Sequence, residues 1–254
     1  MSLPIWTPAA LSSELGPYEG LGWRLVEAQH RVSTLKLVDT LAEQVLLEEL
    51  LETAKPAVPE PCAHLDYLLS TPFRYAPYPY GSRFRRAGFT EGVFYAAERV
   101  ETALAEMAFY RLLFYAESPE TPWPANPAEY TAFAVALATK TTLDLTKGSL
   151  SRDAVAWTNL TDYAACQALA DAAREAGTWI ILYRSVRDPE AGKNIAVLNC
   201  AAFSEPKAVE RQSWRIHLSP SGVRALRDFP ERGLDFSREI FVSDPRLADI
   251  RWER

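Results

Sequence analysis

Residues 92–111, GVFYAAERVETALAEMAFYR, constrain the fold more than any other stretch of this sequence. Residues 92–96 have the short apolar pattern of a buried strand, and residues 100–115 follow as a helix. The helix is apolar on nearly every side, which is typical of a helix packed inside a domain. A carboxylate, Glu106, nevertheless lies among these apolar residues. The stretch therefore predicts a strand running into a helix, with one acidic side chain that needs an explanation.

The rest of the chain alternates between strand-like and helix-like runs. A second helix is expected at residues 162–176, where Asp162 is a candidate N-cap and Gly177 is placed to end the helix. Runs rich in β-branched and aromatic residues predict further strands at residues 130–143, 179–183, 195–199, 214–218 and 239–242. This order predicts a mixed α+β fold that is strand-rich toward the C-terminus.

The N-terminal quarter follows another pattern. Residues 23–54 contain no glycine or proline and repeat apolar residues at helical spacing, so we expect helix there, in one or two pieces. Residues 55–61, KPAVPEP, would end it, because each proline removes a backbone donor. We therefore divide the chain into an N-terminal helical extension with its proline-rich linker, residues 1–65, and a main domain, residues 66–254. The apolar helices could pack within the chain or form a homodimer.

Composition excludes several classes of protein. The 254 residues are 48% hydrophobic, enough to fill a large core. A net charge of −6 provides no basic face for a phosphate backbone, so we expect no direct contact with nucleic acid. We find no export signal, no apolar run of membrane length and three scattered cysteines, and we expect a cytoplasmic protein without a membrane contact. The three histidines are isolated, so we expect no metal site.

An arginine-rich turn is the densest polar feature of the sequence. Arg74 and Tyr75 precede it, and residues 81–88, GSRFRRAG, contain Arg83 and Arg85. Arginines spaced by two along an extended chain point to one side, where their planar guanidinium groups can grip a diphosphate. The alternative is a solvated basic turn that pairs with acidic neighbours. The segment alone favours this second interpretation.

Two other polar features are ambiguous when each is taken alone. Glu106 lies at the margin of the helix, where it is either exposed at the rim or desolvated in a cleft. The cleft is costly unless the carboxylate has partners, so the helix alone favours the exposed rim. Ser185 ends one expected strand and Asn194 begins the next. Residues that form a site are often found at such strand ends, but so are the polar residues of ordinary turns.

Taken together and in this order, these features resemble the RES domain, a family named for an arginine, a glutamate and a serine. The resemblance spans residues 73–203 and rests on the arginine-rich turn, the strand-borne Tyr95, the helical Glu106, and IILYRS at residues 180–185 leading to GKNIAV at 192–197. Two positions depart from the family pattern. SRFR stands where Gly-Arg-Trp/Phe-Asn is common, which leaves open whether Arg83 or Arg85 is the family arginine. Arg184 stands where many members have proline before the serine.

The resemblance implies an ADP-ribosyltransferase-like fold and an enzyme that consumes NAD as a substrate and needs no cofactor. Such an enzyme breaks the nicotinamide–ribose bond and transfers ADP-ribose to water, phosphate or a protein, as a glycohydrolase, phosphorylase or ADP-ribosyltransferase. The family also implies a toxin whose partner is an Xre-type antitoxin. Carried over by position, the catalytic residues are Glu106, Arg85, Ser185 and Tyr95, and the NAD-binding residues are Arg74, Tyr75, Arg83 and Asn194. The alternative is a non-catalytic module that binds a nucleotide or a protein on the same fold.

Overall fold

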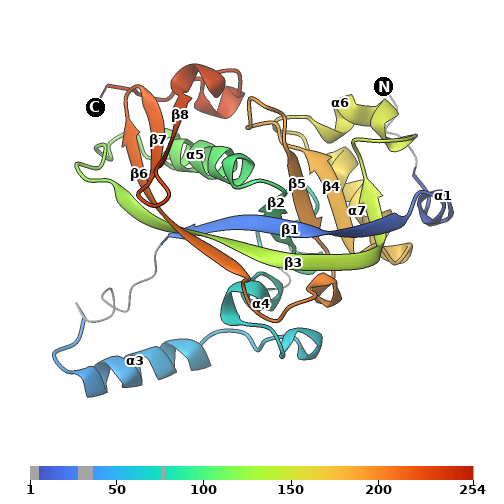
Figure 1. Cartoon of the computed structure of the whole chain (residues 1–254), viewed down its shortest axis with the longest axis horizontal. Coiled ribbons are helices and arrows are strands. Elements are labelled where there is room, and N and C mark those ends of the chain that lie inside the picture. The colour runs from blue at the N-terminus through green and yellow to red at the C-terminus, as the bar shows by residue number, and fades with distance from the viewer. Residues whose placement is uncertain (1–5, 28–36, 76–77, 254) are drawn as a thin grey trace.

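The computed structural model describes residues 6–27, 37–75 and 78–253, which form one mixed α+β fold built on an eight-stranded sheet (Figure 1). This confirms the predicted fold class. The sheet order is β1-β2-β5-β4-β3-β6-β7-β8, with an additional pairing of β1 with β3. The strands are β1 (Gly16–Glu27), β2 (Phe94–Ala97), β3 (Ala128–Asp144), β4 (Ile180–Arg184), β5 (Lys193–Val197), β6 (Glu210–Ser219), β7 (Gly222–Arg227) and β8 (Arg232–Ser237).

The long strand β3 organises the sheet because it has different partners along its length. β1 runs antiparallel along one edge of β3. On the other edge, the first half of β3 pairs with β6 and its last residues pair in parallel with β4. β1 also pairs with β2 at Trp23 and Ala97. The pairings therefore close β1, β2, β5, β4 and β3 into a ring, and β6 to β8 extend the sheet beyond it.

Helices cover both faces of the central strands. The helices are α1 (Pro8–Ser12), α3 (Leu41–Thr53), α4 (Tyr67–Arg74), α5 (Val100–Glu117), α6 (Ala154–Trp157) and α7 (Ala164–Glu175). Successive strand residues point to opposite faces, so Ile180 and Leu182 pack toward α4 while Ile181 and Tyr183 pack toward α7. Burial on both faces explains why β4 is apolar almost throughout. Helix α5 packs in a separate core with β3, β6, β7 and the C-terminal residues.

The predicted strand and helix of residues 92–115 are confirmed as β2 and α5. Two details of the other predictions are wrong. Residues 238–240 form a short 3₁₀ helix, η4 (Arg238–Ile240), where a strand was expected, and α7 begins at Ala164 with Tyr163 as its N-cap. The Asp162 side chain still accepts a hydrogen bond from the Ala164 amide, so it stabilises the turn that leads into the helix.

The predicted N-terminal helical extension is correct only in part. Residues 41–53 form α3, which begins with a capping box between Thr40 and Glu43. Residues 23–27 were expected to be helical but belong to β1, because their pairing with β3 outweighs their local helix preference. Residues 28–36 lie outside the described part of the chain. Since β1 is a strand of the main sheet, residues 16–27 belong with that sheet and not with a helical layer.

Helix α3 exposes a large apolar surface and lies apart from the sheet in Figure 1. Its Leu41, Val45, Leu46, Leu50 and Leu51 side chains are each about half exposed or more. No helix of the described residues is long and apolar enough to cross a membrane. A homodimer, one of the two arrangements that the sequence left open, would bury this apolar surface.

Static light scattering will test the homodimer. We expect the wild-type chain to have the mass of a dimer, and the double substitution Leu46→Ser, Leu50→Ser to reduce it to a monomer, because the apolar contact is lost. Val155→Ser is the control, since Val155 is an exposed apolar residue of α6 far along the chain. A monomeric wild type, or a double variant that stays dimeric, would rule out α3 as a dimer interface.

Candidate active site

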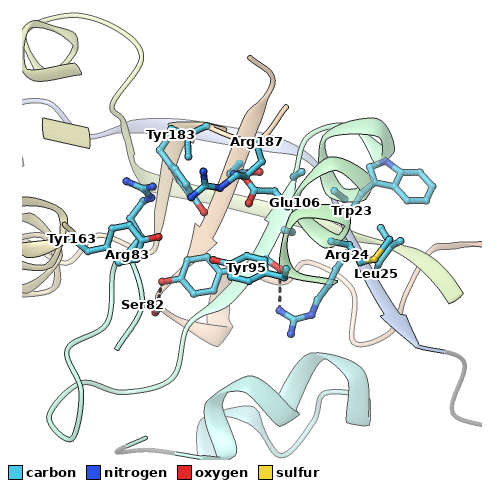
Figure 2. A pocket seen from close by; sticks show the side chains of 17 residues that line it. Trp23, Arg24, Leu25, Ser82, Arg83, Tyr95, Glu106, Tyr163, Tyr183 and Arg187 are labelled. Atoms are coloured by element: carbon cyan, nitrogen blue, oxygen red, sulfur yellow. Dashed lines mark hydrogen bonds between the residues drawn. The ribbon is translucent and has the colours of Figure 1, made fainter. Parts of the chain in front are cut away.

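A cavity of about 340 Å³ lies where β1, β2, β5, α5 and the arginine-rich turn meet (Figure 2). Its wall combines aromatic rings with charged groups. Of the eight residues proposed from the sequence, the structure brings five together at this cavity or directly behind its wall. These are Arg83, Tyr95, Glu106, Ser185 and Asn194.

Glu106 is held by the two other polar residues that the sequence singled out. The Ser185 hydroxyl donates to Glu106 Oε1 at 2.6 Å, and Asn194 Nδ2 donates to the same oxygen at 2.5 Å. Ser185 and Asn194 are both buried and Glu106 is half-buried in the cavity wall. These partners lower the cost of desolvating the carboxylate. The structure thus supports the cleft position of Glu106 over the exposed rim, and no described residue donates to Oε2.

The loop that carries Ser185 is fixed to the first turn of α5. Ser185 Oγ accepts hydrogen bonds from the amides of Arg187 and Asp188, at 3.2 and 3.1 Å. The buried Asp188 carboxylate in turn accepts from Thr102 Oγ1 of α5 at 2.7 Å. Thr102 lies one helical turn before Glu106. The loop and the helix are therefore joined at two places, which fixes the position of Ser185 relative to Glu106.

Gly192→Ala is expected to break this connection. A β-carbon at residue 192 would lie 2.2 Å from Thr102 Oγ1 and 2.6 Å from Asp188 Oδ2, so the hydrogen bond between them could not persist. We expect a loss of about 1–3 kcal/mol in the free energy of unfolding, measured by chemical denaturation. Gly16→Ala is the control, because nothing lies within 4 Å of its β-carbon position. An unchanged midpoint for Gly192→Ala would show that the loop is not held in this way.

Tyr95 connects the arginine-rich turn to strand β2. Its hydroxyl lies 2.8 Å from Ser82 Oγ and accepts from the Phe84 amide at 3.0 Å, while its ring faces the cavity (Figure 2). Burial raises the pKa of Tyr95, so the phenol is neutral at physiological pH. The residue therefore offers the cavity an aromatic surface, and its hydroxyl is used to hold the turn.

The two candidate arginines of the turn have different surroundings. Arg83 is buried in the cavity wall, where it donates to the carbonyls of Trp157 and Asn159 at 2.7 and 2.9 Å and lies 4.5 Å from the Tyr163 ring centroid. Arg85 does not line the cavity. It stacks over Tyr78 at 4.7 Å instead. Of the two, Arg83 is the one that the structure places at the site.

Arg74 and Tyr75 also lie away from the cavity. Arg74 is the last residue of α4 and pairs with Glu52 of α3 at 2.5 Å, and its Nε donates to the Pro56 carbonyl. Tyr75 is the C-cap of the same helix. The structure does not support the expectation that both bind the substrate. Helix α4 ends beside α3 and the proline-rich linker, and neither residue lines the cavity.

Sequence reasoning missed Arg24, an arginine of β1 that lines the cavity. Its Nη1 donates to the Tyr95 carbonyl at 3.0 Å, and burial lowers the pKa of its guanidinium to about 10, which leaves it charged at neutral pH. No carboxylate of the described residues lies within ion-pair distance of it. The alternation of apolar and polar residues at Trp23, Arg24 and Leu25 was a signal for a strand here, but the residues that follow fit a helical pattern equally well.

Arg187 is the second missed arginine of the wall. Together with Arg24 and Arg83 it supplies three positive charges, against the one negative charge of Glu106, so the charged lining sums to +2 (three minus one). A partly enclosed cavity with this charge favours an anionic ligand, because the local dielectric is lower than that of water. Tyr110, Tyr163 and Tyr183 add aromatic surface.

Comparison with known proteins identifies the family. The model of the RES domain matches residues 58–219. The chain belongs to the RES domain family. The match contains β2, α5, β4 and β5, and hence Tyr95, Glu106, Ser185 and Asn194. Strand β1 with Arg24, and the residues after 219, lie outside the region that the RES model matches.

No curated protein matches the chain. Among solved structures, the RES protein is similar to a chain in the crystal structure of the M. tuberculosis MbcT-MbcA toxin-antitoxin complex. The two chains are 13% identical, with a TM-score of 0.47, and the alignment covers 84% of this chain and 93% of that chain. The family assignment rests on the RES model alone.

Proposed function

We propose that this RES protein is an enzyme that consumes NAD by cleaving its nicotinamide–ribose bond. The observation that carries the proposal is the placement of Glu106, held by Ser185 and Asn194, in a cavity whose other charged groups are arginines. An isolated buried carboxylate would be costly. A carboxylate held in place beside cationic and aromatic groups is suited to a substrate that develops positive charge next to a diphosphate.

Glu106 would act on the ribose. Departure of nicotinamide leaves an oxocarbenium-like ribose, and a fixed carboxylate stabilises that charge in the transition state. Since Ser185 and Asn194 both donate to Oε1, the second oxygen of Glu106 is free to face the ribose or to accept a proton from its hydroxyls. In this arrangement Ser185 and Asn194 are positioning residues that act through Glu106.

The arginines would bind the diphosphate. The diphosphate of NAD carries about two negative charges, and charge-assisted hydrogen bonds to arginine are among the strongest that proteins make. Arg24 is suited to this contact, because most of its guanidinium N–H groups are not engaged by described residues. Arg83 already donates hydrogen bonds to the carbonyls of Trp157 and Asn159, which holds the neighbouring loop in place. Its role toward the diphosphate is therefore mainly its positive charge. Fixing the diphosphate in this way positions the scissile bond.

The aromatic side chains would hold the nicotinamide ring. Tyr95 is rigid, since its hydroxyl is bound at both Ser82 and Phe84, and its ring lies in the same wall as Glu106. Stacking of the nicotinamide on such a ring places the glycosidic bond near the carboxylate. The neutral phenol of Tyr95 fits this role, because its flat aromatic face can stack on the positively charged pyridinium ring of NAD.

Release of nicotinamide from NAD by the purified protein is the direct test. Three reactions, with water alone, with added phosphate and with cell extract, distinguish a glycohydrolase, a phosphorylase and an ADP-ribosyltransferase by the ADP-ribose product each one forms. We expect turnover in at least one of them. If NAD binds but is not consumed in any of the three, the chain is a binding module and the enzymatic proposal is wrong.

We also propose that the protein is a toxin neutralised by an antitoxin partner, as the RES family resemblance implies. Expression of the full chain should arrest growth and deplete cellular NAD. Co-expression of the product of the adjacent reading frame should restore both, and a direct complex should be recovered. Growth arrest without a fall in NAD would separate toxicity from the proposed reaction.

A further inference from the structure

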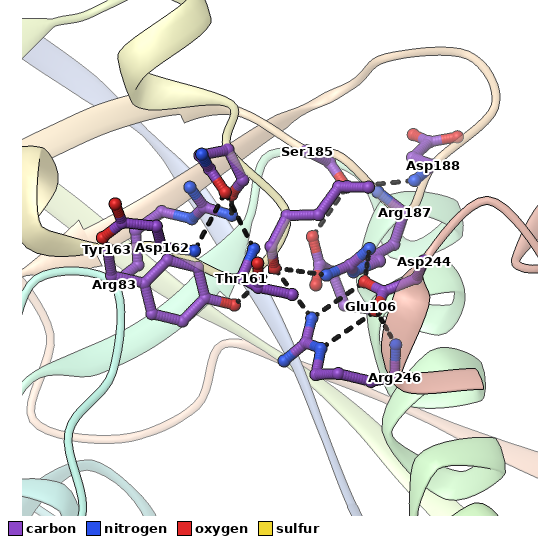
Figure 3. Close-up of polar contacts among 12 residues, drawn as sticks. Arg83, Glu106, Thr161, Asp162, Tyr163, Ser185, Arg187, Asp188, Asp244 and Arg246 are labelled. Carbon is purple, nitrogen blue, oxygen red and sulfur yellow. Dashed lines mark hydrogen bonds and ion pairs between the residues drawn. The ribbon is translucent and has the colours of Figure 1, made fainter. Parts of the chain in front are cut away.

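The C-terminal residues beyond the RES match contribute a charged cluster behind the cavity wall (Figure 3). Asp244 precedes the short helix η5 (Pro245–Leu247) and is only 1% exposed. Its carboxylate pairs with Arg187 at 2.5 Å and with Arg246 at 2.9 Å. Because Arg187 lines the cavity, Asp244 connects the C-terminal segment directly to the candidate active site.

The surroundings of Arg187 leave its guanidinium little freedom. One nitrogen pairs with Asp244, and another donates to the Leu160 carbonyl at 3.2 Å. The guanidinium also lies 3.8 Å from the centroid of the Phe109 ring of α5, in a cation–π contact. Arg187 is 5% exposed. Asp244, the Leu160 carbonyl and the Phe109 ring, from three separate segments of the chain, hold its guanidinium in place.

Arg246 shares every one of these partners. It pairs with Asp244, donates to the same Leu160 carbonyl at 2.9 Å and lies 4.9 Å from the same Phe109 ring. Two guanidinium groups this close repel each other, and Asp244 is the carboxylate between them. Burial opposes ionisation of Asp244, but its hydrogen bonds with Arg246 and the charge of Arg187 outweigh burial and keep its pKa low. Arg187, Arg246 and Asp244 are thus all ionised, and together they carry one net positive charge.

We propose that Asp244 is a positioning residue that holds Arg187 in the cavity wall as part of the binding site for the substrate diphosphate. This inference rests on the proposed function and adds to it a segment that lies outside the region matched by the RES model. Without Asp244, Arg187 would move away from Arg246 and leave the wall, and the cavity would lose a fixed positive charge.

Two probes test this in the full-length protein: NAD turnover, and binding of inorganic pyrophosphate by calorimetry. We expect Asp244→Asn to raise the KM for NAD and the Kd for pyrophosphate by about tenfold, with a smaller change in kcat. If Asp244 only stabilised the fold, its substitution would lower the fraction of active protein. The apparent kcat would then fall while the KM for NAD stayed the same. Asp244→Glu should restore most of the affinity, and Asp249→Asn, on an exposed residue of the same segment, should change neither constant.

A paired substitution covers the case in which Asp244→Asn does not fold. Arg187→Met with Asp244→Leu removes the buried ion pair as a whole. Arg246, the other partner of Asp244, is less buried and keeps its contacts with the Leu160 carbonyl and the Phe109 ring. We expect this folded variant to show the same tenfold weaker pyrophosphate binding. Unchanged pyrophosphate affinity in it, or no pyrophosphate binding by the wild type, would overturn the inference. If the wild type does not consume NAD, the proposed function fails, and the pyrophosphate measurements still decide the role of Asp244.

Discussion

Replacing Glu106 with glutamine is expected to lower the turnover of NAD about a thousandfold while leaving the fold intact. The two bonds to Oε1, from Ser185 and Asn194, can both be kept, because the amide oxygen of glutamine also accepts hydrogen bonds. The amide nitrogen would then face the cavity in place of Oε2. A neutral NH₂ group cannot stabilise an oxocarbenium-like ribose, so the chemical step is lost although the side chain stays in place.

The measurement is nicotinamide release at saturating NAD, with thermal unfolding recorded for each variant. Glu101→Gln is a matched control, because Glu101 is an acidic residue of the same helix that pairs with Arg232 and does not line the cavity. We expect it to retain wild-type turnover. A well-folded Glu106→Gln protein with normal turnover would show that another carboxylate carries the reaction.

Replacing Arg24 with methionine is expected to weaken the binding of ADP-ribose about tenfold to a hundredfold. ADP-ribose is the probe because it retains the diphosphate and cannot react. The loss follows from removing a half-buried cation that no described carboxylate neutralises. The same burial lowers the pKa of Arg24, so folding works against this charge. Removing the charge relieves that cost, and the melting temperature should not fall to the extent expected for loss of a structural ion pair.

The combination of weaker binding with retained stability is the diagnostic result, measured by calorimetry and thermal unfolding. Arg85→Met serves as the control, since Arg85 stacks on Tyr78 outside the cavity. We expect it to leave the affinity for ADP-ribose unchanged. If Arg85→Met weakened binding and Arg24→Met did not, the diphosphate would lie near the arginine-rich turn and the assignment of Arg24 would be wrong.

Glu106, Ser185 and Asn194 could be found from the sequence because each has a local signal. Glu106 is a carboxylate in an otherwise apolar helix, and the other two lie at strand ends. Their order along the chain matched the RES pattern, and the structure brings them within hydrogen-bond distance. Tyr95 had no such local signal and was found only through the resemblance to the RES pattern. Local periodicity and strand boundaries are properties of neighbouring residues, so they can be read without the fold.

The arginines were harder to assign, because a guanidinium has a long stem and its target is set by distant segments. Arg74 lies close to the arginine-rich turn in sequence, yet helix α4 directs it to Glu52. Arg24 lies far from the turn in sequence, yet it reaches the Tyr95 carbonyl, because β1 pairs with both β2 and β3. That pairing is non-local, and residues 23–27 taken alone fit a helix as well as a strand.

The sequence by itself determined the mixed α+β class, the β2 strand running into α5, and the carboxylate at the centre of the site, since these depend on periodicity and on the order of residues along the chain. Only the tertiary structure decided which arginines surround that carboxylate. The closed ring of strands brings Arg24 to the cavity, and the C-terminal segment places Asp244 behind Arg187. Contacts between segments so distant in sequence are selected by sheet register and by the pairing of buried charge, which no local pattern contains.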